Sequence, residues 1–172
     1  MIRFRFPDGA IESFAPEARE MLHRVCPHEV GHAVVAMHFG ARVHGVALAQ
    51  ADGGVEAVAI YEIEQEMPRN DWCTIKAAGS AGEVIAFGSY GPAGAKTDLE
   101  DIRRKGCAGK FDDLVRQATS ILLNRRARFE RLTRLLCNRI FDSNDVISMM
   151  PLRLRKVGAY LLDEADFATH RK

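Results

Sequence analysis

Two histidines four residues apart, with a glutamate directly after the first, constrain the folding of this chain more than any other feature. The segment reads His28-Glu29-Val30-Gly31-His32. Side chains at this spacing share a face on an α-helix, where two imidazoles can reach one zinc ion. On such a helix Glu29 is placed to take a proton from a water molecule bound to that zinc. The pattern therefore predicts a helical zinc site with Glu29 as general base.

The competing interpretation is a helix with two unrelated histidines, one of them buried and hydrogen-bonded, and with Glu29 in solvent. A third ligand would distinguish the two, because catalytic zinc has three protein ligands and one open position. No third histidine follows six residues after the motif. Two carboxylates are candidates: Glu83 in an alanine-rich segment and Asp98 after a glycine-rich segment.

Proline and glycine residues around the motif predict where the helices of this region begin and end. Pro16 is expected to open a helix that runs through Cys26, and Pro27 is expected to kink that helix or to start a new one. The helix carrying the motif should end at Phe39, closed by Gly40. Its apolar side chains recur at helical spacing and predict one buried face: Val30, Ala33, Val34, Ala36 and Met37.

A small β element is expected beside these helices. β-Branched residues on both sides of Asp52-Gly53-Gly54 predict a hairpin over residues 42–61. We expect the strand over 42–49 to be an edge strand that either pairs with an extended peptide or simply packs in the domain. A second short hairpin is predicted over residues 1–14, around Pro7-Asp8-Gly9.

The remainder of the sequence predicts further helices. The small side chains of the alanine-rich helix imply close packing against a neighbour, and Thr97 with Glu100 forms a capping box that would place Asp98 in a first turn. The expected spans are Asp71 as N-cap to Phe87, a helix starting after Thr97, the longest helix over 112–141, and weaker helices over 144–150 and 152–162.

Composition indicates one ordinary globular domain over residues 1–172. The chain has 24 basic and 23 acidic side chains and is 47% hydrophobic. No apolar run approaches the roughly 20 residues that span a bilayer, and the N-terminus lacks the apolar stretch of a signal peptide. We therefore expect a cytoplasmic protein. No G-x-x-x-x-G-K-[ST] loop occurs, so any activity is expected to proceed without an ATPase of its own.

Basic residues are concentrated in the second part of the chain. Acidic side chains outnumber basic ones before residue 100, and the balance reverses after it. The arginines over 125–139 lack interleaved aromatic residues and are interrupted by Glu130, so nucleic-acid binding is not favoured. A solvated helix face or a surface for an acidic protein partner fits this pattern better.

Three segments together resemble the peptidase domain of the FtsH family of ATP-dependent zinc metalloproteases. They are the motif at 28–35, the segment Ala78-Gly79-Ser80-Ala81-Gly82-Glu83 with its continuation to Gly88, and Gly94-Ala95-Lys96-Thr97-Asp98-Leu99. The order and the approximate spacing are those of the family, over about residues 26–140. The resemblance implies a mainly helical, zincin-like α+β domain.

The same resemblance implies a role for each site residue. His28, His32 and Asp98 would bind Zn²⁺, Glu29 would be the general base, and Glu83 would orient a ligand from behind. The implied activity is hydrolysis of peptide bonds in unfolded or flexible protein substrates, with a separate ATPase as a possible partner.

Several departures from the family keep other functions open. The family's Gly-Gly-Arg and paired glutamates are reduced here to Ala78-Gly79-Ser80 with Glu83 alone, and Pro27 directly precedes the first histidine. The transmembrane segment and the ATPase module are absent from this sequence. A catalytically inactive peptidase fold that acts as a binding or regulatory module is one alternative. Hydrolysis of a small non-peptide amide is another.

Overall fold

The computed structural model describes residues 16–51, 54–142 and 160–168. This part of the chain is mainly helical and contains a three-stranded antiparallel sheet, so the prediction of an α+β fold with a small β element is confirmed. The hairpin predicted over 1–14, the turn at 52–53 and the helix predicted over 144–150 lie outside the described residues.

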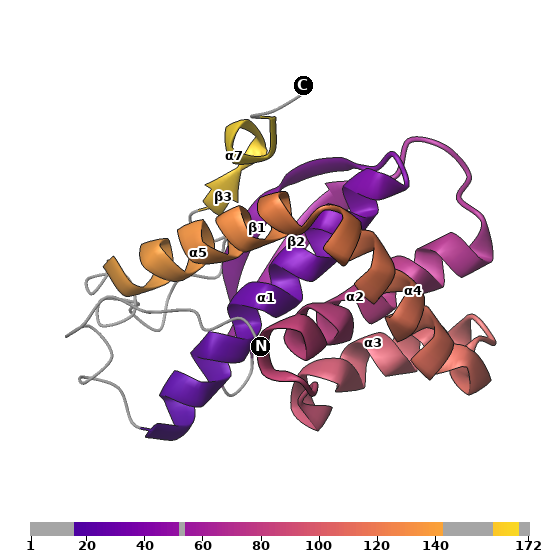
Figure 1. Cartoon of the computed structure of the whole chain (residues 1–172), viewed down its shortest axis with the longest axis horizontal. Helices are drawn as coiled ribbons and strands as arrows, with labels where there is room; N and C mark the ends of the chain where they lie inside the picture. Colours follow the sequence, from indigo (N-terminus) through magenta and orange to yellow (C-terminus); the bar gives the residue numbers. More distant parts are fainter. Residues whose placement is uncertain (1–15, 52–53, 143–159, 169–172) are drawn as a thin grey trace.

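Helix α1 (Pro16–His38) is the central element. It contacts helices α2, α4 and α5 and strands β1 and β2, and in Figure 1 it crosses the middle of the molecule. The new helix start predicted at Pro27 is wrong, because α1 continues through that residue. Residues 26–36 are buried throughout rather than on one face, as expected for a helix enclosed by other elements.

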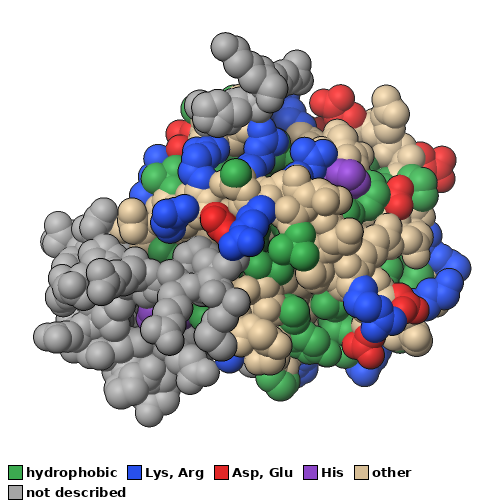
Figure 2. Space-filling view, viewed as in Figure 1, with side chains coloured by type: hydrophobic (Ala, Val, Ile, Leu, Met, Phe, Trp, Pro, Cys, Tyr) green, Lys and Arg blue, Asp and Glu red, His purple; other side chains and the backbone are tan. Residues whose placement is uncertain are grey.

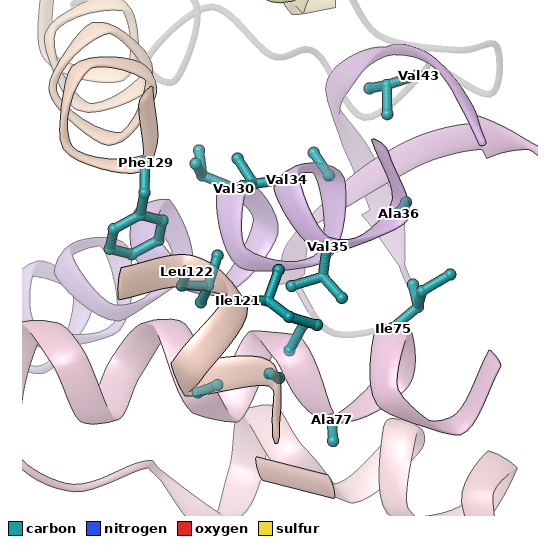
Figure 3. Close-up of a cluster of buried hydrophobic side chains, with 14 of the residues drawn as sticks. Val30, Val34, Val35, Ala36, Val43, Ile75, Ala77, Ile121, Leu122 and Phe129 are labelled. Carbon is teal, nitrogen blue, oxygen red and sulfur yellow. The ribbon is translucent and has the colours of Figure 1, made fainter. Parts of the chain in front are cut away.

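The core surrounds α1. Figure 3 shows Val30 and Val34 lying between Phe129 on one side and Ile75 on the other, and all four side chains are fully buried. Since each such side chain is removed from water on every side, burial contributes roughly 1.5–3 kcal/mol per large residue. This packing fixes the position of α1, which carries both histidines of the motif.

Helix α2 (Arg69–Phe87) packs against α1 at a distance that only glycine permits. A Cβ atom on Gly31 would lie 2.3 Å from the carbonyl oxygen of Ala78, and one on Gly82 would lie 2.0 Å from that of Pro27. The close packing predicted for the alanine-rich helix is confirmed. The predicted N-cap is wrong, because α2 begins at Arg69 and Asp71 lies in its first turn.

Gly82→Ala should destabilise the protein by about 3 kcal/mol, because both helices would have to separate to admit the methyl group. The higher helix propensity of alanine acts in the opposite direction but is worth only about 1 kcal/mol. Urea unfolding monitored by circular dichroism measures the difference. Gly109→Ala is the matched control, since nothing lies within 4 Å of a Cβ at that position. Equal unfolding midpoints for the two variants would contradict the prediction.

The sheet has the order β2-β1-β3, formed by β1 (Arg42–Ala51), β2 (Gly54–Glu62) and β3 (Tyr160–Asp163). β1 pairs with β2 along its length and with β3 at Gly45–Ala47, so it is a central strand and its prediction as an edge is wrong. Residues 160–162, predicted as the end of a helix, belong to β3. Among the described residues, β2 has a paired strand on one side only.

Helix α3 (Pro92–Arg104) begins earlier than predicted. Gly91 is its N-cap and Pro92 occupies the first turn, where the ring's fixed φ and missing N–H are compatible with a helix start. The capping box at Thr97 is therefore wrong, and Asp98 lies in the body of the helix. After the 3-10 helix η2 (Ala108–Lys110), the predicted helix over 112–141 is divided at Arg125 into α4 (Phe111–Asn124) and α5 (Arg126–Asp142).

Basic side chains are frequent on the surface over α5 (Figure 2). Several of them bind acidic or carbonyl groups of this chain. Within α5, Arg126 pairs with Glu130. Arg139 pairs with the carboxylate of Asp166 in helix α7 (Glu164–Ala168), and the backbone carbonyl oxygen of Asp166 accepts a 2.7 Å hydrogen bond from Arg131. Arg131 and Arg139 therefore attach α7 to α5. None of the described helices combines the length and apolar character needed to cross a bilayer.

Candidate metal centre

Helices α1 and α3 bring three buried side chains together. Asp98 Oδ2 lies 3.3 Å from His28 Nε2 and 3.0 Å from His32 Nε2. The three side chains share one small space, with ligand atoms all within 4.8 Å of one another. A carboxylate and two imidazoles facing one point form a group that could hold a metal ion.

The spacing of these atoms suits a small metal ion with tetrahedral ligands. A tetrahedral zinc ion with bonds of about 2.0–2.1 Å separates its ligand atoms by roughly 3.3 Å. The two measured separations to Asp98 Oδ2 are close to that value. Two imidazole nitrogens and one carboxylate oxygen would fill three of the four positions around a tetrahedral ion.

Each histidine is held through its other ring nitrogen. His28 Nδ1 lies 2.8 Å from Glu83 Oε1, and His32 Nδ1 lies 2.7 Å from the carbonyl oxygen of Ile75. Both oxygens can accept a hydrogen bond from Nδ1–H, so each Nε2 faces Asp98 and, once deprotonated, can turn its lone pair to a metal ion. Histidines that bind metals are oriented in this way.

Glu83 lies behind His28 rather than beside Asp98. Its second oxygen accepts a 2.8 Å hydrogen bond from the Gly91 amide and pairs with Arg24 Nη1 at 3.2 Å. The geometry therefore favours Asp98 over Glu83 as third ligand, and it gives Glu83 contacts that orient His28 and fix the start of α3. Although burial raises the pKa of Glu83, these partners together lower it below its ordinary value.

If the centre binds a divalent metal ion, tested with Zn²⁺, Glu83→Gln should weaken that binding about tenfold, toward the lower end of the range for groups that orient a ligand. The amide keeps an acceptor for His28 but removes the charge that makes the imidazole a stronger donor to the metal. Competition with a chromogenic chelator measures the affinity. Glu100→Gln, an exposed change on α3, is the control. Equal affinities for the two variants would show that Glu83 does not act on His28.

The backbone of α2 closes one side of this centre. A Cβ atom on Gly79 would lie 2.4 Å from His28 Nε2 and 2.5 Å from His32 Nε2. Any side chain there would displace the atoms that face Asp98. Gly79 therefore allows α2 to approach the two histidines as closely as this arrangement requires.

Glu29 is buried beside the three candidate ligands. Its Oε2 accepts a 2.8 Å hydrogen bond from the backbone N–H of Ala59 in β2. Burial raises the pKa of Glu29, and the neighbouring His32 and His28 offset only part of that effect. A raised pKa lies closer to neutral pH, and a general base is most effective when its pKa is near the pH at which it works.

Asp98 and the histidines form a charged group in the metal-free protein. Burial lowers the pKa of His28, but hydrogen bonds with Asp98 and Glu83 outweigh this effect and raise it to about 10. Burial also opposes ionisation of Asp98, yet His32 and His28 hold its pKa well below the ordinary value. At neutral pH, His28 is therefore protonated and Asp98 is ionised when no metal is bound.

If the centre binds a divalent metal ion, tested with Zn²⁺, binding at neutral pH should release a proton from His28. Since the pKa of His28 is about 10, its proton competes with the metal at every lower pH, and affinity should rise about tenfold per pH unit from this group. Above pH 10 that contribution ends. Titration calorimetry in two buffers of different ionisation enthalpy counts the protons released. A pH-independent affinity between pH 6 and 8 would contradict the assignment.

Lys76 is the site residue that sequence analysis missed. Its Nζ lies 3.6 Å from Asp98 Oδ1 and 3.0 Å from Asp101 Oδ2. Lys76 and Glu83 are the only charged residues between Trp72 and Phe87, and their spacing places both near Gly79 on one face of α2. Two isolated charges sharing a face of an apolar helix were the signal that could have identified Lys76.

Comparison with known proteins adds no identification. The chain matches no family model, and no curated protein is similar to it. The sequence motifs and the geometry of the centre therefore carry the functional argument. The geometry brings His28, His32 and Asp98 together, with Glu29 and Glu83 as their neighbours.

Proposed function

We propose that this chain is a zinc metallopeptidase with a zincin-like site similar to that of the FtsH peptidase domain. The observation that carries the proposal is the buried group of His28, His32 and Asp98, with both histidines fixed through Nδ1. In this proposal the three side chains hold Zn²⁺, and Glu29 is the general base. The motif alone would be weak support, but here a carboxylate from another helix completes the ligand set.

In the proposed reaction, the metal ligands, Glu29 and the backbone of Ala59 have separate roles. Zinc bound at this site would supply Lewis acidity, which lowers the pKa of a coordinated water toward 7. Glu29 takes a proton from the attacking water and gives it to the amine nitrogen that leaves. The N–H of Ala59 holds the carboxylate of Glu29 in place, and the burial of the site excludes bulk water around it.

The substrate is proposed to pair with β2 rather than with β1. β2 has a paired strand on one side only among the described residues, and Ala59 donates its N–H to Glu29. That edge of the strand therefore adjoins the general base. An extended segment of an unfolded or flexible protein can add to a sheet edge through its backbone, with little dependence on side-chain sequence.

Elemental analysis and a cleavage assay test this function together. Purified protein should contain one zinc ion per chain, and His28→Ala should contain almost none. With zinc bound, the protein should cleave a reduced and alkylated substrate protein, and a chelator should stop the cleavage. Full zinc content without cleavage of any unfolded substrate would favour the binding or regulatory alternative. Absence of zinc from both proteins would refute the metal assignment.

A further inference from the structure

Lys76 contacts the third proposed ligand on the side away from the histidines. Asp98 Oδ2 lies at 3.0–3.3 Å from both Nε2 atoms, while Asp98 Oδ1 lies 3.6 Å from Lys76 Nζ. The two oxygens of one carboxylate are thus divided between two partners. An ion pair on Oδ1 favours binding of a metal ion through Oδ2 alone.

The ammonium group of Lys76 is itself held in place. Asp101 lies one helical turn after Asp98 on α3 and accepts Lys76 Nζ at 3.0 Å. The ring of Trp72, one turn before Lys76 on α2, lies 5.7 Å from the same nitrogen. The side chain of Lys76 is 24% exposed, so water screens these contacts only in part. An anchored cation can fix the orientation of Asp98.

Charge balance explains how a cation can lie beside a metal centre. Lys76 is paired with Asp101, which also lies 3.4 Å from the exposed Arg104, and Arg24 is paired with Glu83 on the opposite side of His28. Glu29 and Asp98 are then left to balance the two positive charges of a divalent ion. Asp101 therefore offsets part of the positive charge that Lys76 places beside the proposed metal ligands.

We propose that Lys76 is a positioning residue that holds Asp98 as a one-oxygen ligand and so keeps the fourth zinc position open. This proposal rests on the proposed zinc site. Without Lys76, Asp98 would be free to turn and to offer both oxygens, which fills the open position or misplaces the ligand. Groups that orient metal ligands typically change affinity 10–100-fold when they are removed.

The test uses Zn²⁺ affinity, measured by chelator competition, in the full chain. Lys76→Met should weaken affinity about 10–100-fold relative to the parent. Lys76→Arg should retain most of the parent's affinity, because a guanidinium can also bind Asp98 Oδ1. Lys105→Met is the matched control: Lys105 lies over the same Trp72 ring, at 5.3 Å. The double variant Lys76→Met with Asp101→Asn keeps the net charge, so a loss of affinity in it reports orientation rather than charge.

A spectroscopic readout separates positioning from general destabilisation. Co²⁺ in place of Zn²⁺ should give strong visible bands of four-coordinate geometry in the parent, and weaker bands of higher coordination in Lys76→Met. Zn²⁺ affinity of Lys76→Met equal to or above that of the parent, or identical Co²⁺ spectra, would overturn the proposal. If the parent itself binds no Zn²⁺, the proposed function fails first, and the role of Lys76 fails with it.

Discussion

Glu29→Gln is expected to abolish peptide hydrolysis while leaving zinc bound. Glutamine has nearly the same shape, and its carbonyl oxygen can still accept the hydrogen bond from Ala59. It cannot take a proton from water at neutral pH. General base catalysis is typically worth 10²–10⁴-fold, so the turnover number should fall by about that factor. The measurement is cleavage of a quenched fluorescent peptide, with zinc content determined on the same sample.

Glu62→Gln is the control for this experiment, because Glu62 is an exposed carboxylate on the same strand as Ala59. Its activity should match that of the parent. Normal turnover in Glu29→Gln would exclude Glu29 as the base. Loss of zinc together with activity would instead give Glu29 a part in metal binding.

Asp98→Ala is expected to lower zinc affinity by more than about a hundredfold, the upper end of the effect of removing a group that merely orients a ligand. Alanine removes one of the three ligands and the negative charge shared between the imidazoles. Chelator competition at pH 7.5 measures the effect, with Glu100→Ala on the same helix as control. The expected order is a far larger loss for Asp98→Ala than for Glu83→Gln.

The reverse order would transfer the third-ligand assignment to Glu83. Protonation adds a second check on Asp98. In the metal-free protein the pKa of His28 is raised to about 10, and Asp98 is one of the groups that raise it. Removing Asp98 should bring the pKa of His28 down, which NMR titration of the imidazole can follow without any metal.

The helix that carries the motif could be predicted from sequence because its signals are local. Spacing of four residues between His28 and His32 is sufficient to place both on one face, whatever the surroundings. The third ligand could not be derived in the same way. Spacing alone left Glu83 and Asp98 equal, and the family resemblance favoured Asp98. The geometry supports that preference through the packing of α3 against α2, a long-range arrangement.

The start of α3 shows how a tertiary contact decides between two local signals. Thr97 with Glu100 and Gly91 with Pro92 are both acceptable helix starts. The earlier one is used, and the amide of Gly91 donates to Glu83 on α2. A buried carboxylate that needs donors therefore fixes the beginning of the helix. This long-range pairing cannot be seen in the local sequence.

The position of β1 depends on a distant part of the chain. Its hairpin with β2 was predicted from the β-branched residues and the glycine turn, and the pairing is confirmed. Its central place in the sheet comes from β3, which begins only at Tyr160. The sequence around β3 carried no strand signal strong enough to displace a helix prediction, so the open edge was assigned to the wrong strand.

The three proposed ligands come from two helices that lie far apart in the sequence, so a bound metal ion would link distant parts of the chain. Two of them lie on α1, and the third lies on α3, which follows β1, β2 and α2 in the chain. An ion held by both helices would be a reversible cross-link that closes a long loop. At a free zinc concentration of a hundred times the dissociation constant, such binding stabilises the folded chain by about 2.7 kcal/mol. Metal supply would then control how often α3 detaches from α1, and with it the protein's resistance to degradation.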